Sequence, residues 1–244
     1  MPLEPPPTPP TTRAMRTLLA PAPLVAGSLI LDGDEAHHGR SVLRLRPGDR
    51  VRVADGAGHE GEAEVLAVER NELRLAVAEV GVLPAGPLAM LTIATAVPKG
   101  DRFADLVRGL TEMGVGRILP LACARGERVP ANLDRVQRVA AEALKQCRRG
   151  HLPQVGPVVD IPGLAVLGGD LTVLDRSGTA PRIGEVRPTT LVIGPEGGLT
   201  PDEVAALTAA GARTVRLAGP ILRIETAALA AAAVWSATWE HLSP

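Results

Sequence analysis

Aromatic side chains are almost absent from the 244-residue sequence, which has no tyrosine, one phenylalanine and two tryptophans. This scarcity argues against stacking of nucleic-acid bases on aromatic rings as a main mode of binding. Lysine is also scarce, because Lys99 and Lys145 are the two lysines among 26 basic residues. The others are arginines, which suit forked contacts to phosphate. A high-GC codon bias produces the same arginine excess, so composition alone does not predict a nucleic-acid partner.

Cysteine and histidine are too few and too scattered to indicate a metal site or a disulfide framework. Cys123 and Cys147 have no CxxC spacing, and the five histidines show no HExxH motif. The sequence has no run of about 18 apolar residues, and its N-terminus lacks the apolar core of a signal peptide. We therefore expect a soluble, cytoplasmic protein with no metal and no membrane segment.

The chain divides by composition and pattern into a leader and two domains. Residues 1–14, with "MPLEPPPTPPTT", form a proline-rich leader that is predicted to be disordered. Residues 15–83 contain the alternating runs "VRVAD", "EAEVLAV" and "LRLAVAEV", which predict a small β-barrel domain. Residues 84–87 are predicted to be a linker. Residues 88–244 alternate short apolar runs with helical segments, a pattern typical of an α/β domain with a parallel sheet.

Two segments of the second domain show the spacing of amphipathic helices. In "DRFADLVRGLTEMG", five apolar residues share one face, with Asp101 as the expected cap and Gly114 as the expected stop. In "NLDRVQRVAAEALKQC", the apolar face continues as far as Cys147, and Lys145 is expected to point away from it.

The stretch "LVIGPEGGLTPDEVAAL" joins an apolar strand to a helix through a glycine-rich loop. Thr200, Pro201 and Glu203 fit the cap, first and third positions of a capping box. The adjacent glycines Gly197 and Gly198 allow positive φ and a close approach of backbone to a ligand. A small-molecule site and a well-capped tight turn explain this loop equally well when it is considered alone.

A second loop of this kind follows "TVRLAG" and leads into the alanine-rich "PILRIETAALAAAAVWSATW", where it places Arg223 and Glu225 at the start of a helix. Because parallel strands end at the same edge of a sheet, where α/β proteins bind ligands, both loops are expected at one site. The alternative is a surface ion pair between Arg223 and Glu225, which would contribute little to stability. The first strand of the domain is followed by "PKGDR" and not by GxGxxG, which argues against a nucleotide-dependent oxidoreductase.

The two loops together, "IGPEGGLTPDEV" and "LAGPILRIETAALAA", closely resemble the ribosomal RNA small subunit methyltransferase E family of the SPOUT superfamily. The resemblance covers the chain beyond the leader. "HHGRSVLRLRPGD" and "ADGAGHEGEAEV" resemble the PUA-like RNA-binding domain, and "LTEMGVGRILPL" and "AEALKQCRRGHLPQV" resemble the middle motifs. It implies a SPOUT-type α/β domain with a trefoil knot, a PUA-like β-barrel before it, and a homodimer. The family commonly has Glu in place of Lys145.

The resemblance also implies that the knotted domain binds S-adenosylmethionine, largely through backbone atoms. The residues that it assigns to this cofactor are Leu174, Gly194, Gly197, Gly198, Leu217, Gly219, Ile221 and Leu222. Two roles are open for Glu196. We favour the first, in which its charge holds the loop through amide hydrogen bonds, over the second, in which it lies near the cationic sulfonium.

The reaction implied by the resemblance is methylation of N3 of a uridine in 16S ribosomal RNA. N3 of neutral uridine carries a proton, which has to leave before or during attack on the methyl group. Arg223 is expected to stabilise charge on the uracil carbonyl oxygens, because it is too basic to accept the proton. Glu225, Glu196 and water are the open choices for the proton acceptor. Cys147 is expected to be a packed free cysteine and not a nucleophile, since it continues an apolar helix face.

Two arginine-rich clusters are the expected sources of RNA contacts, each with a local charge of about +4. One comprises Arg40, Arg44, Arg46, Arg50 and Arg52 against Asp49, and the other comprises Arg135, Arg138, Lys145, Arg148 and Arg149 against Glu142. The residues assigned to RNA are Arg40, Arg44, Arg125, Arg148 and Arg149. The alternative for each cluster is a solvated polar face in an arginine-biased sequence.

Two wider alternatives stay open. A noncatalytic RNA-binding or ribosome-assembly factor would keep the knotted domain without methyl transfer, and cofactor affinity discriminates between these functions. In the last helix, Trp235 and Trp239 either anchor an interface between subunits or are buried within one subunit. The partners that we expect are 16S ribosomal RNA or the small ribosomal subunit, and a second copy of the chain.

Overall fold

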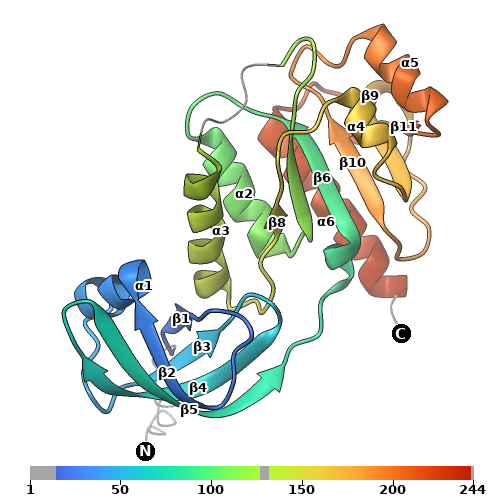
Figure 1. Cartoon of the computed structure of the whole chain (residues 1–244). Helices are drawn as coiled ribbons and strands as arrows, with labels where there is room; N and C mark the ends of the chain where they lie inside the picture. The colour runs from blue at the N-terminus through green and yellow to red at the C-terminus, as the bar shows by residue number, and fades with distance from the viewer. Residues whose placement is uncertain (1–14, 127–131, 243–244) are drawn as a thin grey trace, which may run out of the picture.

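The computed structural model describes residues 15–126 and 132–242, and the predicted leader, residues 1–14, lies outside them. A five-stranded sheet is built within residues 17–82 and a six-stranded sheet within residues 91–215. In Figure 1 the first sheet forms the lower part of the molecule, and the second lies between layers of helices in the upper part.

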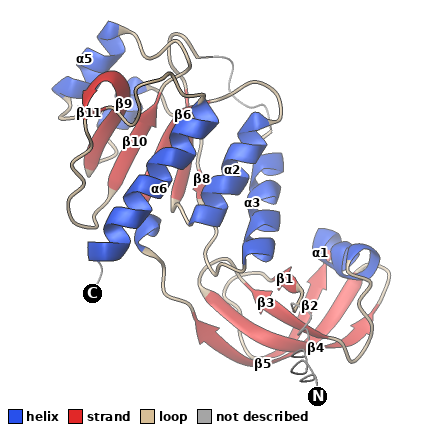
Figure 2. Cartoon of the chain, turned by 180° about the vertical axis from the view of Figure 1, so that it is seen from behind, coloured by secondary structure: helices blue, strands red, loops and turns tan. Residues whose placement is uncertain are grey.

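The N-terminal sheet is small and strongly curved (Figure 2). Its strands in spatial order are β1 (Thr17–Leu19), β3 (Arg50–Ala54), β4 (His59–Val68), β5 (Glu72–Val82) and β2 (Gly27–Asp32). β1 and β3 are parallel, and the other pairs are antiparallel. Alternate residues, among them Val51, Val53, Leu73 and Leu75, are fully buried, as the period-two pattern predicts. Helix α1 (Gly33–His37) adds Ala36 to this core, and the π-helical turn η1 (His38–Val42) follows it.

The second sheet is entirely parallel in the described residues, as the sequence predicts. Its strands in spatial order are β11 (Arg213–Val215), β9 (Asp170–Thr179), β10 (Thr189–Ile193), β6 (Leu91–Ala96), β7 (Arg117–Leu121) and β8 (Gln154–Val155). β10 pairs with β9 on one side and with β6 on the other, so the chain returns to the middle of the sheet. The trefoil knot that the resemblance implies stays a prediction, because strand order alone does not decide it.

Helices cover both faces of the parallel sheet (Figures 1 and 2). One side carries α2 (Arg102–Met113), α3 (Leu133–Cys147), α6 (Ile224–Leu242) and the short 3-10 helix η2 (Pro87–Met90). The other side carries α4 (Ile161–Ala165) and α5 (Pro201–Ala209). In β10, Leu191 and Ile193 belong to the core on the α6 side, and Val192 belongs to the core on the α5 side. The strands are continuous apolar runs because both of their faces are buried.

The structure confirms two of the three predicted helix-end signals and differs from the third. Gly114 ends α2 with a left-handed φ of 86°. Thr200 and Glu203 form the predicted capping box of α5. Asp101 precedes α2, but its side chain makes no cap hydrogen bond and pairs instead with Arg135 of α3 at 2.7 Å.

The expectation that Lys145 points away from the packed face of α3 is wrong. Its side chain is 7% exposed, and its Nζ lies 3.1 Å from Glu35 of α1 and 2.7 Å from Glu142. Glu35 also accepts a hydrogen bond from the Leu19 N–H at 2.9 Å. A buried ammonium requires such partners, because an unpaired charge is costly to desolvate. Lys145 therefore docks the barrel on α3 and is not available to RNA.

The two tryptophans of α6 are buried within the chain. Trp235 and Trp239 are 2% and 1% exposed and lie in the core between α6 and the sheet. The indole Nε1 of Trp239 donates to the Gly184 carbonyl at 3.1 Å. The alternative in which these side chains anchor an interface between subunits is therefore wrong.

Candidate active site

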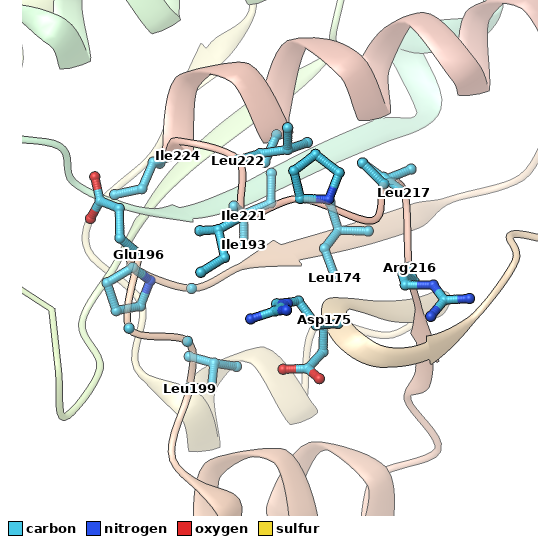
Figure 3. A pocket seen from close by; sticks show the side chains of 18 of the residues that line it. Leu174, Asp175, Ile193, Glu196, Leu199, Arg216, Leu217, Ile221, Leu222 and Ile224 are labelled. Carbon is cyan, nitrogen blue, oxygen red and sulfur yellow. The ribbon is translucent and has the colours of Figure 1, made fainter.

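A pocket of about 530 Å³ lies where strands of the parallel sheet end (Figure 3). Its walls come from Leu174 and Asp175 of β9, from the loop that follows β10, and from the connection between β11 and α6. Parallel strands deliver their carboxyl ends to one edge of the sheet, so the fold brings the two motif loops together as predicted.

Seven of the eight residues assigned to the cofactor line this pocket. They are Leu174, Gly194, Gly197, Gly198, Leu217, Ile221 and Leu222. Gly219 lies outside the lining, between Ala218 and Pro220, which belong to it. Glu196 and Arg125 also line the pocket.

The glycines of the loop after β10 serve different purposes. Gly198 has a left-handed φ of 69°, and its N–H donates to the Pro195 carbonyl at 2.8 Å, which closes the turn. A Cβ on Gly194 would lie 3.0 Å from the backbone nitrogen of Leu199, so this position requires a close backbone approach. Gly197 has no positive φ, and a Cβ there would meet Arg125 at 3.7 Å, an ordinary contact. The expected conformational need for glycine thus applies to Gly198 and not to Gly197.

Glu203 ties this loop to the segment after β7. Its carboxylate accepts hydrogen bonds from the N–H groups of Ala124 at 2.6 Å and Thr200 at 2.7 Å. Burial alone would raise the pKa of Glu203, but these backbone hydrogen bonds lower it below its ordinary value. The neighbouring Arg125 donates through Nη1 to the Gly197 carbonyl at 2.7 Å. Arg125, which was assigned to RNA, therefore lies at the wall of the pocket and holds the glycine loop.

Arg102 is a pocket neighbour that the sequence interpretation missed. Its Nη1 lies 3.5 Å from Oε1 of Glu225 and 3.9 Å from Oε1 of Glu196. Glu196 accepts no amide hydrogen bond from the described residues, so the favoured role of holding its loop in that way is not supported. The signal was present in the sequence, since "PKGDR" follows the first strand of the sheet and therefore shares the same edge.

Arg223 and Glu225 do not form the surface pair considered as an alternative. Glu225 pairs with Arg102, and its second oxygen, Oε2, is buried with no hydrogen-bond partner among the described residues. Arg223 is exposed between Leu222 and Ile224, which both line the pocket, although Arg223 itself does not. Its side chain makes no hydrogen bond or ion pair with the part of the chain that the structure describes.

The sequence interpretation missed other lining residues, although they too lie toward the carboxyl ends of parallel strands. Asp175 and Arg216 come directly after the apolar residues of β9 and β11, and Figure 3 shows them at the opposite end of the pocket from Glu196. Cys147 does not line the pocket. It is half-buried, and its thiol donates to the Leu144 carbonyl at 3.7 Å, which agrees with the expected packing role.

The first basic cluster is only partly free. Arg50 and Arg52 of β3 form ion pairs with Glu62 and Glu60 of the neighbouring strand β4, which cancels their charge. The expected local charge of +4 is therefore wrong for this cluster as a whole. A groove at this cluster is lined by Met15, Arg16, Arg44, Leu45, Arg46, Asp49 and Arg50. Because Arg50 is paired with Glu62, this leaves three arginines against one aspartate.

The second cluster is also largely engaged in the fold. Arg149 donates through Nε to the Glu112 carbonyl and through Nη2 to the Met113 carbonyl, both at 2.8 Å. These bonds satisfy carbonyl groups at the end of α2, so Arg149 caps this helix, and its assignment to RNA stays a prediction. Arg148 is exposed, with one weak bond at 3.5 Å to the Met15 carbonyl.

The described residues contain neither a membrane-spanning helix nor a cluster of metal ligands. None of the helices in those ranges is long and apolar enough to cross a membrane. Within the same ranges, His, Cys, Asp and Glu side chains form no group of three or more that is placed to hold a metal ion.

Comparisons with known proteins assign both parts of this architecture. A family model described as an RNA methyltransferase domain matches residues 85–236, and one described as an RNA methyltransferase PUA domain matches residues 31–77. A PUA-like barrel that precedes a parallel α/β domain with a strand-end pocket thus defines a class of RNA methyltransferases.

Individual relatives identify the family within that class. Ribosomal RNA small subunit methyltransferase E of Mycobacterium tuberculosis is 35% identical over 233 residues, which cover 86% of this chain and 88% of the relative. The protein of the same name from Synechocystis is 32% identical over 242 residues, covering 93% and 78%. The crystal structure of a ribosomal RNA small subunit methyltransferase E from Neisseria gonorrhoeae bound to S-adenosyl methionine has a TM-score of 0.82 and 26% identity, covering 92% and 98%. The chain belongs to the ribosomal RNA small subunit methyltransferase E family.

Proposed function

We propose that this protein transfers a methyl group from S-adenosylmethionine to N3 of a uridine in 16S ribosomal RNA, in the cytoplasm. The observation that carries the proposal is the strand-end pocket, because its walls are the two motif loops by which the chain resembles its family. The family name of the relatives supports ribosomal RNA of the small subunit as the substrate.

The residues of the pocket fit S-adenosylmethionine. Its volume lies within the range of small-molecule sites, roughly 300–1,000 Å³. Leu174, Leu217 and Leu222 supply apolar walls for a flat purine, and Gly198, where no atom lies within 4 Å of the position a Cβ would take, leaves backbone accessible beside them. When bound, the cofactor supplies an electrophilic methyl group.

The chain's own residues have to manage the proton of N3 and the charge that develops on uracil. Glu196, Glu225 and water are the candidate proton acceptors: Glu196 lines the pocket and half of its side chain is exposed, whereas Glu225 does not line it and its Oε2 is buried with no hydrogen-bond partner among the described residues. Arg223 is the residue that we assign to the uracil carbonyl oxygens. Its side chain is free of partners in the described chain, and its two neighbours in sequence, Leu222 and Ile224, line the pocket. The N3 proton has to leave for one of these acceptors before or during formation of the N3–methyl bond.

The barrel is proposed to bind the phosphates of the RNA through the arginine-rich groove. Arg44 and Arg46 line it, and neither side chain pairs with another described residue. Arg44 has a positive φ of 52°; the other non-glycine residue with positive φ in the described ranges, Arg148 at 59°, is the left-handed C-cap of α3. A left-handed backbone costs such a residue about 1–2 kcal/mol, and positions of this kind concentrate at functional sites. Arg40 and Arg148 are proposed as further contacts to the RNA.

A homodimer is proposed because the groove and the pocket belong to distant parts of the chain. Figure 1 shows the barrel at one end of the molecule and α5, which follows the pocket loop, at the other. Two copies would let the barrel of one subunit present RNA to the pocket of its partner. Light scattering on the purified protein should give twice the 25.3 kDa of the chain. A monomer mass at working concentration would contradict this arrangement.

The function is tested by mass mapping of modified nucleosides in small-subunit RNA from cells with and without the protein. Loss of N3-methyluridine at one site, and its return when the gene is restored, is the expected result. An unchanged signal would contradict the assignment. If the purified protein binds RNA but neither binds S-adenosylmethionine nor methylates, the noncatalytic alternative holds.

A further inference from the structure

Arg102, the first residue of α2, lies between two carboxylates that come from the two motif loops. Its Nη1 is 3.5 Å from Oε1 of Glu225, the second residue of α6, and 3.9 Å from Oε1 of Glu196, in the loop after β10. Its Nε donates to the Lys99 carbonyl at 3.2 Å, which orients the guanidinium against its own turn. One cation thus connects three segments that are remote in sequence.

The loop that carries Glu196 depends on side chains from elsewhere in the chain. Within the loop, the Gly198 N–H bond to Pro195 closes the turn but does not attach the turn to α6. Arg125 holds the Gly197 carbonyl from the side of β7. Arg102 connects the loop to α6, because it lies near both Glu196 of the loop and Glu225 of α6. Glu196 and Ile224 lie near each other at one end of the pocket in Figure 3 and both line it.

Removal of the Arg102 charge would leave Glu196 and Glu225 near one another without a counterion. Like charges repel, more strongly near a protein surface than in bulk water. Because half of the Glu196 side chain is exposed, its loop is the part that is free to move away. The pocket would then widen between that loop and the start of α6.

We propose that Arg102 is a positioning residue of this pocket, which ties the Glu196 loop to the start of α6 through Glu225. The inference rests on the proposed function, because the ligand whose binding it governs is S-adenosylmethionine. It predicts that substitutions of Arg102 and of Glu225 weaken cofactor binding through the same contact, so that their effects do not add.

The test is calorimetry of S-adenosylmethionine binding to the full chain as wild type, Arg102→Gln, Glu225→Gln and the double variant. Each single substitution should weaken Kd by roughly tenfold, and the double variant should be no weaker than either, because both remove the same contact. Arg102→Lys should recover part of the affinity, since it keeps the charge without the planar fork. Arg108→Gln is the matched control on the same helix, where Arg108 forms an exposed pair with Asp105, and its Kd should equal that of the wild type.

The outcomes separate the inference from the function on which it rests. Measurable wild-type binding with an unchanged Kd in Arg102→Gln, or with fully additive losses in the double variant, would overturn the inference alone. A wild-type protein without affinity for the cofactor would overturn the proposed function and this inference with it. Circular dichroism and Tm identify a variant that fails to fold. If Arg102→Gln does not fold, the other two single variants decide. Wild-type affinity for the cofactor in both Arg102→Lys and Glu225→Gln would overturn the inference. Reduced affinity in Glu225→Gln would support it.

Discussion

Arg223 is a side chain whose proposed role depends on charge and not on packing. It is exposed, and it makes no side-chain bond to the described residues, so the fold does not depend on it. We expect Arg223→Ala to lower the single-turnover rate by roughly a hundredfold, comparable to the loss of one preorganised donor, with cofactor affinity and Tm nearly unchanged. Arg223→Lys should restore only part of the rate, because lysine lacks the planar fork. The measurement is methylation with saturating cofactor and RNA, and a near-normal rate for the alanine variant would remove Arg223 from the reaction.

Gly198 and Gly197 are adjacent but should respond differently to the same substitution. Gly198 has a φ of 69°, where alanine costs about 1–2 kcal/mol, whereas Gly197 has an ordinary φ and room for a Cβ. Gly198→Ala is therefore expected to weaken S-adenosylmethionine binding by roughly tenfold. Gly197→Ala should have a clearly smaller effect on Kd. Calorimetry on both variants checks this pair, and equal effects would contradict the conformational argument.

The turn between β3 and β4 is organised by one buried carboxylate, Asp55. It accepts hydrogen bonds from the N–H groups of Leu24, Ala57 and His59 at 2.8–3.0 Å, and it contacts Nδ1 of His59 at 2.7 Å. Burial alone would raise the pKa of Asp55, but these bonds lower it from 3.8 to about 2.

The lowered pKa of Asp55 fixes the sign of a pH effect on stability. Because the folded carboxyl binds its proton less readily than the unfolded one, its contribution is fully present above about pH 4 and is lost as the pH falls toward 2. We expect wild type to exceed Asp55→Asn in free energy of unfolding by on the order of 2 kcal/mol at pH 7. This advantage should shrink between pH 4 and pH 2. Urea unfolding of both proteins across that range measures it, and a constant difference would contradict the assignment.

RNA binding by the whole molecule should depend on the groove of the barrel and not on every arginine of the surface. Replacing Arg44 and Arg46 together with alanine should weaken RNA binding and reduce the slope of log K against log salt by roughly one unit per lost contact. Arg74→Ala is the control, because Arg74 is exposed but paired with Glu69 and Glu72 outside this groove. Filter binding at several salt concentrations gives the slopes. Equal slopes for the double variant and the control would make the groove a solvated face.

Features that depend on neighbours along the chain were predictable from the sequence. The strand runs, the capping box at Thr200 and the stop at Gly114 follow from periodicity and local backbone chemistry, and all of them are present. The meeting of the two motif loops was also predictable, because parallel strands share a carboxyl edge. Together these features and the resemblance determined the fold class, the family and the two loops that supply most of the pocket lining.

The partners of individual charges were decided only by the tertiary structure. Lys145 was expected on a free face of α3, but the barrel packs against that face and places Glu35 beside it. Arg149 is predicted from the sequence to contact RNA, and the structure adds two carbonyl partners at the end of α2 that the sequence did not indicate. Arg102 meets Glu225 across 123 positions of sequence. A charged side chain pairs with whatever lies within a few ångströms of it, and residues that far apart along the chain acquire that proximity only when the sheet and its helices have assembled.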